Sequence, residues 1–195
     1  MNVLLLNASP RRAGIVSQAL AAAETAARRA GAETLRIELY DRPIAPCTGC
    51  MRCRTIGVCA LPRDAAHELG EAIRRADLLV VGTPTYWGGM AAQLKLLFER
   101  LVPLFMGESA RGIPQPRLRG RRAIVVAACT TPWPFNLLFG QSRGAVRSVR
   151  EVLSTGGMRV RSVEIAGTKA LDGRLPEAAE SRIERLVRRA VKTKR

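Results

Sequence analysis

Aromatic side chains and histidine are scarce in this chain of 195 residues. Phe, Trp and Tyr make up 4% of the sequence, and His67 is its single histidine. Single-stranded nucleic acids bind by stacking their bases on aromatic rings, so the scarcity of rings does not favour a nucleic-acid-binding protein. With one histidine, placed in a helical pattern, we also expect no Ser-His-Asp or Cys-His catalytic group.

Long hydrophobic runs are missing as well. No apolar run approaches the roughly 20 residues that a membrane-spanning helix needs. The first residues lack the positive segment and the small-residue cleavage pattern of a secretory signal. Hydrophobic residues nevertheless make up 47% of the chain, enough for a packed core. We therefore expect one cytoplasmic domain, residues 1–195, that makes no contact with membranes.

Acidic residues are half as numerous as basic ones. The chain has 16 Asp and Glu against 32 Lys and Arg, which gives a formal net charge of +16. Of the basic residues 28 are arginine, and they are scattered from Arg11 to Arg195. A basic surface attracts polyanions, so a basic nucleic-acid-binding module stays as an alternative, although the sparse aromatic residues count against it.

Short apolar runs alternate with helical patterns along the chain. The runs predict strands at 3–6, 34–40, 78–81, 123–128 and 160–165. Helices are expected at 16–30, 64–75, 90–104 and 144–153 and from Pro176 onward, with an exposed loop at 107–120. This alternation predicts a parallel sheet with helices on both faces, and such sheets bind ligands at the carboxyl ends of their strands.

The loop after the first predicted strand runs from Asn7 to Ser17. The helix that follows would present free backbone N–H groups and a partial positive charge, which suit a phosphate. Ser9 and Ser17 add hydroxyl donors, and Arg11 adds a cation. The loop contains neither of the common glycine-rich nucleotide signatures. A loop in which Ser17 only caps the helix and the arginines are solvated is the alternative.

The loop after the third predicted strand, residues 83–90, holds Tyr86 and Trp87, one of the two tyrosines and one of the two tryptophans. Gly88 and Gly89 follow them and allow a ligand to approach the backbone closely. Rings at the carboxyl end of a strand can lie against a flat heterocycle. The alternative is that they pack this loop onto the sheet.

Together these segments resemble the NADPH-dependent FMN reductase family, a flavodoxin-like group that includes the iron–sulfur flavoproteins. The resemblance lies in Asn-Ala-Ser-Pro-Arg at 7–11 and Thr-Pro-Thr-Tyr-Trp-Gly at 83–88. It continues through Gln93-Leu94-Lys95 and Glu99-Arg100 to residues 134–142. It implies an α/β fold of three layers with a doubly wound, five-stranded parallel sheet of order 2-1-3-4-5.

The resemblance also implies non-covalently bound FMN. Its phosphate would lie among Ser9, Arg11 and Ser17. The isoalloxazine ring would lie against residues of the second loop: Pro84, Thr85, Tyr86, Trp87 and Gly88. Thr131, in the loop after the fourth predicted strand, is a further candidate for flavin contact, with a place in a subunit interface as the alternative for that loop. Where the family often has Gly-Asn-Thr or Gly-Asn-Ser, this chain has Gly14-Ile15-Val16-Ser17, so we expect no side-chain contact from Ile15 or Val16.

For function, the resemblance implies an NAD(P)H-dependent oxidoreductase. Hydride would pass from NAD(P)H to the flavin, and the electrons would pass on to a quinone, a flavin or another small-molecule or protein acceptor. Flavin chemistry needs no catalytic side chain, and we assign none. The family resemblance further implies a homodimer or homotetramer.

A cysteine-rich loop, residues 43–63, contains four of the five cysteines: Cys47, Cys50, Cys53 and Cys59. The spacing C-x2-C-x2-C-x5-C resembles the compact motif of the iron–sulfur flavoproteins, which implies a 4Fe–4S cluster and an alternative function as an electron carrier. Close thiolates do hold such clusters. Free thiols without metal, a zinc site and reversible disulfides are the other interpretations. Cys129 stands apart, and we expect it to be a small buried residue.

Overall fold

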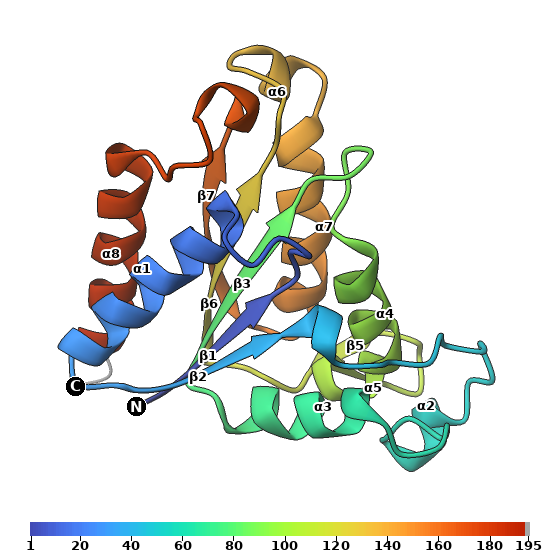
Figure 1. Cartoon of the computed structure of the whole chain (residues 1–195). Coiled ribbons are helices and arrows are strands. Elements are labelled where there is room, and N and C mark those ends of the chain that lie inside the picture. Colours follow the sequence, from blue (N-terminus) through green and yellow to red (C-terminus); the bar gives the residue numbers. More distant parts are fainter. Residues whose placement is uncertain (194–195) are drawn as a thin grey trace.

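A computed structural model of the chain describes residues 1–193. Its main sheet has five parallel strands in the order β2-β1-β3-β6-β7 (Figure 1). The strands are β1 (Asn2–Asn7), β2 (Glu33–Glu38), β3 (Leu78–Pro84), β6 (Arg122–Ala128) and β7 (Arg159–Ile165). Counted among the sheet strands alone, this order is 2-1-3-4-5, so the expected topology is confirmed.

Helices cover both faces of the sheet and make it the middle of three layers (Figure 1). One face carries α1 (Ile15–Arg29) and α8 (Glu177–Lys192). The other carries α3 (Ala65–Arg75), α4 (Ala92–Arg100), α5 (Val102–Phe105) and α7 (Gln141–Thr155). Successive side chains of a strand point to opposite faces, so the apolar run of β1 supplies both cores.

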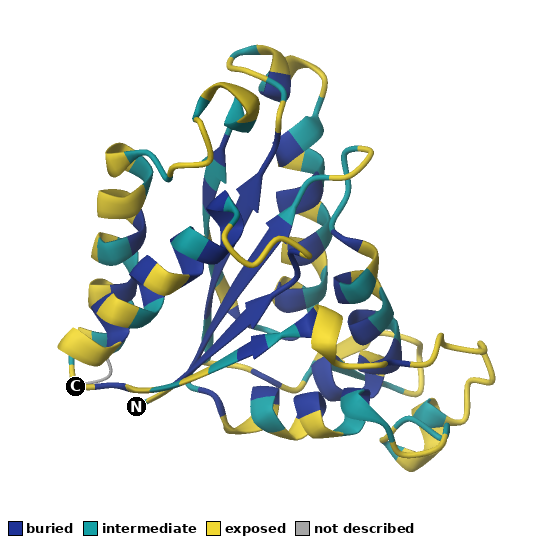
Figure 2. Cartoon of the chain, viewed as in Figure 1, coloured by how far each residue is buried: buried dark blue, intermediate teal, exposed yellow. Residues whose placement is uncertain are grey.

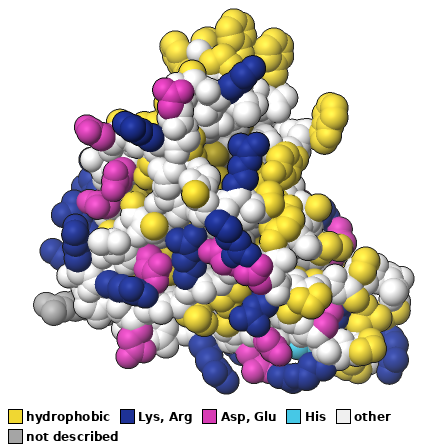
Figure 3. Space-filling model, viewed as in Figure 1, with side chains coloured by type: hydrophobic (Ala, Val, Ile, Leu, Met, Phe, Trp, Pro, Cys, Tyr) yellow, Lys and Arg dark blue, Asp and Glu magenta, His cyan; other side chains and the backbone are white. Residues whose placement is uncertain are grey.

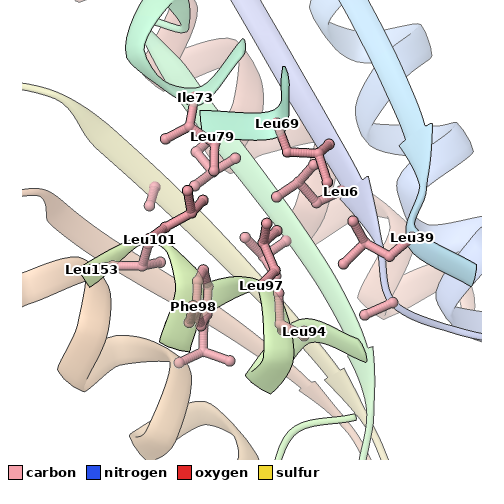
Figure 4. Packing of buried hydrophobic residues seen from close by; sticks show 14 of the residues in the cluster. Leu6, Leu39, Leu69, Ile73, Leu79, Leu94, Leu97, Phe98, Leu101 and Leu153 are labelled. Atoms are coloured by element: carbon pink, nitrogen blue, oxygen red, sulfur yellow. The ribbon is translucent and has the colours of Figure 1, made fainter. Parts of the chain in front are cut away.

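Two hydrophobic cores result from that alternation. Val3 and Leu5 belong to the core beneath α1 and α8. Leu6 belongs to the opposite core, where Figure 4 shows it near Leu69 of α3, with Leu97 of α4 close by. Figure 2 shows the sheet as the most continuously buried part of the molecule. Packing in the two cores fixes the strands, and therefore the starting points of the loops that follow them.

The remaining elements are short: η1 (Leu39–Asp41), α2 (Cys53–Ile56), β4 (Met106–Glu108), β5 (Pro114–Pro116), α6 (Phe135–Leu138) and η2 (Thr168–Ala170). Three of them modify the sequence expectations. The cysteine-rich loop contains α2, and the loop expected at 107–120 contains an antiparallel β4–β5 pair. The helix expected at 90–104 is divided into α4 and α5, because Pro103 has no backbone N–H to donate to the preceding turn.

All five parallel strands end at one edge of the sheet. The loops after β1, β3, β6 and β7, whose last residues are Asn7, Pro84, Ala128 and Ile165, meet at that edge. Within the described residues no helix is both long and apolar enough to cross a membrane. That residues 1–195 form a single domain stays a prediction.

Candidate functional site

A cavity of about 420 Å³ lies at the carboxyl edge of the sheet. That volume is within the range of small-molecule binding sites. Its walls come from four loops, which follow β1, β3, β6 and β7. They contribute Ser9, Arg11, Gly14, Ile15, Val16, Pro84, Thr85, Tyr86, Ala128, Cys129, Thr130, Thr168, Lys169 and Gly173.

The first wall is shaped by the buried side chain of Asn7. Its Oδ1 accepts a hydrogen bond from the backbone N–H of Ser9 at 3.1 Å, and its Nδ2 donates to Ser17 Oγ at 2.8 Å. Ser17 Oγ in turn donates to the carbonyl oxygen of Arg11 at 2.8 Å. Ser9 and Arg11 therefore line the cavity, whereas Ser17 lies behind the loop and holds its shape. The direct contact of Ser17 with a phosphate stays a prediction.

The amino end of α1 opens toward the same wall. The residue before the helix, Gly14, caps it without a side-chain hydrogen bond, and no acidic residue lies in the first turn. A Cβ on Gly14 would come within 2.9 Å of the Cβ of Arg11, so the tight turn needs glycine. The uncapped N–H groups and the helix dipole favour an anion here.

The second wall is the loop after β3. Thr85 is anchored by its N–H, which donates to the carbonyl oxygen of Ala128 at 2.8 Å, and a narrow turn pairs Tyr86 with Gly89. Pro84, Thr85 and Tyr86 line the cavity. Thr85 Oγ1 is buried and has no hydrogen-bond partner in the described chain, an unsatisfied donor and acceptor that a ligand can engage.

Trp87 and Gly88 lie outside the cavity walls. The Trp87 side chain is fully exposed, at a backbone φ of +51°. Gly88 lies against α7, where its carbonyl oxygen faces Gly144. Both were expected to contact a flat ring; their positions at the rim allow that only for a ligand that extends beyond the walls, and their contact stays a prediction.

The third wall is the end of β6. The Cys129 thiol is buried, and burial raises its pKa above the usual value, so this part of the wall is uncharged at neutral pH. Thr131, expected to contact the flavin, does not line the cavity. Its carbonyl oxygen accepts from the N–H of Gly167 at 2.9 Å and ties the third wall to the fourth.

The fourth wall, formed by Thr168, Lys169 and Gly173 after β7, was missed by sequence reasoning. A signal existed: the rule that places ligands at the carboxyl ends of parallel strands applies to the fifth strand as well as to the others. The segment carries no recognisable motif, so only its position beside α1 and β6 identifies it as part of the site.

Beyond the cavity, α6 and the residues before it present exposed hydrophobic side chains. Trp133, Phe135, Leu138 and Phe139 are all exposed, and the rings of Phe135 and Phe139 stack with centroids 6.1 Å apart. Figure 3 shows hydrophobic side chains gathered at this tip of the molecule. Exposed apolar patches of this kind mark interaction surfaces.

The cysteine-rich loop leaves the sheet after β2, outside the cavity walls, and leads to α3 (Figure 1). Its four thiols are free, Cys47 and Cys50 exposed, Cys53 and Cys59 half-buried. Burial first, and then the neighbouring thiols, raise the pKa of Cys53. Across residues 1–193 no three His, Cys, Asp or Glu side chains come together as a metal site.

Arg100, the last residue of α4, holds both ends of this loop. Its side chain is buried, and its Nε donates to Cys59 Sγ at 3.0 Å while Nη1 donates to the carbonyl oxygen of Ala45 at 2.7 Å. The guanidinium also forms a two-pronged ion pair with Asp64, at 2.7 and 3.1 Å. Asp64 caps α3 by accepting from the N–H of Ala66, as expected. Arg100 is thus a structural support of the cysteine loop, whereas Glu99 pairs with Lys95 on the surface of α4.

The residues of the cavity can be compared with the needs of FMN, and those of the cysteine loop with the needs of a 4Fe–4S cluster. FMN fits: the uncapped helix end and the cation of Arg11 suit a phosphate, and the unpartnered Thr85 Oγ1 suits a polar ring atom. A 4Fe–4S cluster fits the donor set, since four free thiols lie in one loop and two of them, Cys47 and Cys59, already accept N–H hydrogen bonds. The loop does not gather the four sulfurs around one point.

Comparison with known proteins agrees with this geometry. The family model described as NADPH-dependent FMN reductase matches residues 1–170. An iron–sulfur flavoprotein of Methanocaldococcus jannaschii is 36% identical over 111 residues, which cover 57% of this chain and 57% of the relative. The chain thus spans little more than half the length of such curated relatives.

Solved structures share the fold at low sequence identity. An FMN-dependent NADH-azoreductase from Bacillus anthracis, in complex with FMN, has a TM-score of 0.72 at 15% identity and covers 98% of both chains. An NAD(P)H:quinone oxidoreductase from Methanothermobacter marburgensis has a TM-score of 0.72 at 22% identity, over 99% of this chain and 96% of that one. These neighbours confirm the flavodoxin-like fold. The chain belongs to the NADPH-dependent FMN reductase family, a family of oxidoreductases.

Proposed function

We propose that this protein binds FMN in the cavity at the carboxyl edge of its sheet and acts as an NAD(P)H-dependent oxidoreductase. The observation that carries the proposal is the polarity of the cavity. One end has Arg11 and the uncapped amino end of α1, and the other has Pro84, Thr85 and Tyr86. A phosphate at the first end and a flat ring at the second match that division.

FMN, when bound, supplies the redox chemistry, because its ring accepts hydride from a reduced nicotinamide and releases electrons singly or in pairs. The protein's residues hold and orient it. Ser9 and Arg11 bind the phosphate, and Ser17 keeps their loop in shape through the carbonyl oxygen of Arg11. Thr85 Oγ1 provides a hydrogen bond at the ring, and the neutral Cys129 thiol leaves the wall behind it uncharged.

Trp87, Gly88 and Thr131, which lie outside the cavity walls, are proposed as further contacts of a flavin ring that extends past those walls. NAD(P)H and the acceptor would bind to the flavin in turn. As acceptor we propose a quinone, a flavin or another small molecule, in keeping with the quinone oxidoreductase and azoreductase names of its structural neighbours.

The test is flavin binding followed by reduction. Protein freed of ligand is titrated with FMN, and NADPH or NADH is then added without air. We expect FMN to bind, and its oxidised absorbance bands to bleach on addition of the nicotinamide and return with quinone. A chain that does not take up FMN contradicts the proposal, and a flavin that binds but is not reduced contradicts its enzymatic part.

A second function is favoured by a specific observation, the charged hydrogen bond from Arg100 to Cys59. N–H donors to sulfur stabilise thiolate ligands of iron–sulfur clusters, and the curated relatives are iron–sulfur flavoproteins. In this alternative, Cys47, Cys50, Cys53 and Cys59 would hold a 4Fe–4S cluster, which transfers single electrons, and the protein would be an electron carrier.

Iron content separates the two functions. Protein purified without air is analysed for iron and acid-labile sulfide, alongside a Cys50→Ser variant. About four irons per chain in the parent protein, lost in the variant, support the carrier. Iron-free protein whose flavin reduction is unchanged by Cys50→Ser supports the plain reductase.

We further propose a homodimer or homotetramer built through the exposed hydrophobic side chains around α6. The free and exposed thiols of Cys47 and Cys50 are stable in reducing surroundings, so the cytoplasm is the compartment that we propose.

A further inference from the structure

The fourth wall of the cavity is fixed on two sides. The N–H of Thr168 donates to the carbonyl oxygen of Cys129 at 3.0 Å, which ties the wall to the end of β6. On the other side, Gln18 of α1 accepts from the N–H of Leu175 at 2.9 Å and donates to the carbonyl oxygen of Gly173. The segment from Thr168 to Leu175 is therefore held beside the amino end of α1.

This wall brings a second cation to the cavity. Among the described residues that line it, Arg11 and Lys169 are the charged ones, and no carboxylate accompanies them. Neither side chain forms an ion pair or a hydrogen bond within the described part of the chain. Asp172, the nearest acid in the same segment, does not line the cavity. Two unneutralised cations and the uncapped amino end of α1 border the same cavity, which therefore favours an anionic ligand.

We propose that Lys169 is a further cofactor-binding residue, which binds the phosphate of FMN together with Arg11. The inference rests on the proposed function, since it presumes that FMN occupies this cavity. A phosphate monoester dianion has three oxygens to satisfy, so the α1 amino end, Arg11 and the Lys169 ammonium can each bind a different face of it. The chain thereby compensates for Gly14-Ile15-Val16, a stretch without hydroxyl or amide side chains.

The experiment compares FMN with riboflavin, which lacks the phosphate. Dissociation constants of both are measured by flavin fluorescence for the parent protein and for Lys169→Gln, Lys169→Arg and Arg174→Gln. Arg174 is exposed in the same segment but does not line the cavity, so it is the matched control for loss of one positive charge. We expect Lys169→Gln to weaken FMN binding about tenfold. Riboflavin binding should stay within about twofold, and Lys169→Arg should restore FMN binding.

The other outcomes are decisive against the inference. If Lys169→Gln leaves FMN binding unchanged, or weakens FMN and riboflavin equally, the lysine does not contact the phosphate. If FMN binding is unchanged while the KM for NADPH rises and that for NADH does not, Lys169 binds the 2′-phosphate of NADPH instead. A parent protein that binds neither flavin overturns the proposed function itself, whereas a failure confined to Lys169→Gln overturns the inference alone.

Discussion

At the scale of single residues, the site depends on side chains that no ligand touches. Asn7 is completely buried, and its two amide ends connect Ser9 with Ser17 and so set the curvature of the first loop. Arg100 does the same for the cysteine loop, where it links Ala45, Cys59 and Asp64. A buried polar group that loses a hydrogen-bond partner lowers the stability of the fold, so we expect substitutions of Asn7 and Arg100 to be destabilising.

The Arg100–Asp64 pair makes a prediction about acid stability. Burial alone would raise the pKa of the Asp64 carboxyl, but hydrogen bonds from Ala45, Arg100 and Ala66 outweigh it and hold the pKa below its ordinary value near 3.8. A lowered pKa in the folded state adds stability above the ordinary pKa, and this is lost as the pH falls through the folded-state pKa. We expect Asp64→Asn to cost about 3 kcal/mol near pH 7 and to flatten the loss below pH 3.8.

Urea unfolding between neutral and acid pH measures this effect. Glu68→Gln is the control, because Glu68 is exposed and lies 3.9 Å from Arg42 in a weak surface pair. Its cost should stay within about 0.5 kcal/mol. Parallel stability curves for Asp64→Asn and the parent protein would show that this ion pair contributes nothing specific.

Substitution of Trp87 should affect FMN binding without affecting the stability of the fold. Because its side chain is fully exposed, Trp87→Ala should leave the unfolding midpoint unchanged, while FMN retention falls about fivefold through the loss of ring contact. Ile113→Ala, at an exposed residue of the distant β4–β5 turn, is the control. Fluorescence titration with FMN measures the difference. Full retention of FMN by Trp87→Ala would show that the flavin ring does not contact Trp87.

At the scale of elements, the second wall is held by the close approach of α7. The position of Gly144 leaves no room for a side chain, since a Cβ there would overlap the carbonyl oxygen of Gly88. The amino end of α7 and the loop after β3 therefore move together. The backbone contact explains why a small residue stands in the first turn of an otherwise ordinary helix.

Gly144→Ala should thus lower the free energy of unfolding, whereas the same substitution at an ordinary helical position raises it. Alanine in place of glycine usually stabilises a helix by up to about 1 kcal/mol. Here we expect a loss of about 1–3 kcal/mol, together with weaker FMN binding, because the clash is with backbone. Gly70→Ala in α3 is the control, since its Cβ would meet only the flexible ends of the Leu101 and Leu104 side chains. A stabilised Gly144→Ala protein would contradict the packing described.

At the scale of the whole molecule, two features bear on association with other copies of the chain. They are the net charge of +16 and the exposed apolar tip at α6. The charge opposes close association of copies, so an interface has to bury enough apolar surface to offset repulsion. The tip, which lies at the same edge of the sheet as the cavity, gathers exposed aromatic and leucine side chains suited to this.

Substitution at the tip tests the proposed assembly. Leu138→Ser combined with Phe139→Ser should convert the oligomer to monomer, with little change in folding because both side chains are about 70% exposed. Sedimentation velocity measures the change, and Ile113→Ser, an exposed site on the β4–β5 turn, is the control. An unchanged sedimentation coefficient in the double variant would exclude this surface as the interface.

The sequence by itself determined the strands of the main sheet and the long helices, the strand order through family resemblance, and the loops that contribute Ser9, Arg11, Pro84, Thr85 and Tyr86 to the cavity. It did not predict the short elements α2, β4, β5 and α6. These follow from local patterns: apolar periodicity reports which side of an element is buried, and turn residues report where it ends. The expected helix starts and ends shifted by a few residues where Pro103 and the α6 turn interrupt them.

Only the tertiary structure decided that Lys169 joins the cavity, that Ser17 lies behind it and that Trp87 is outside its walls. The contacts responsible join distant residues, such as Gln18 with Leu175 and Arg100 with Cys59, which are 157 and 41 positions apart. Local periodicity has no information on such pairs. They exist because parallel strands, joined by crossover helices, bring the loops after β1, β3, β6 and β7 to one edge of the sheet.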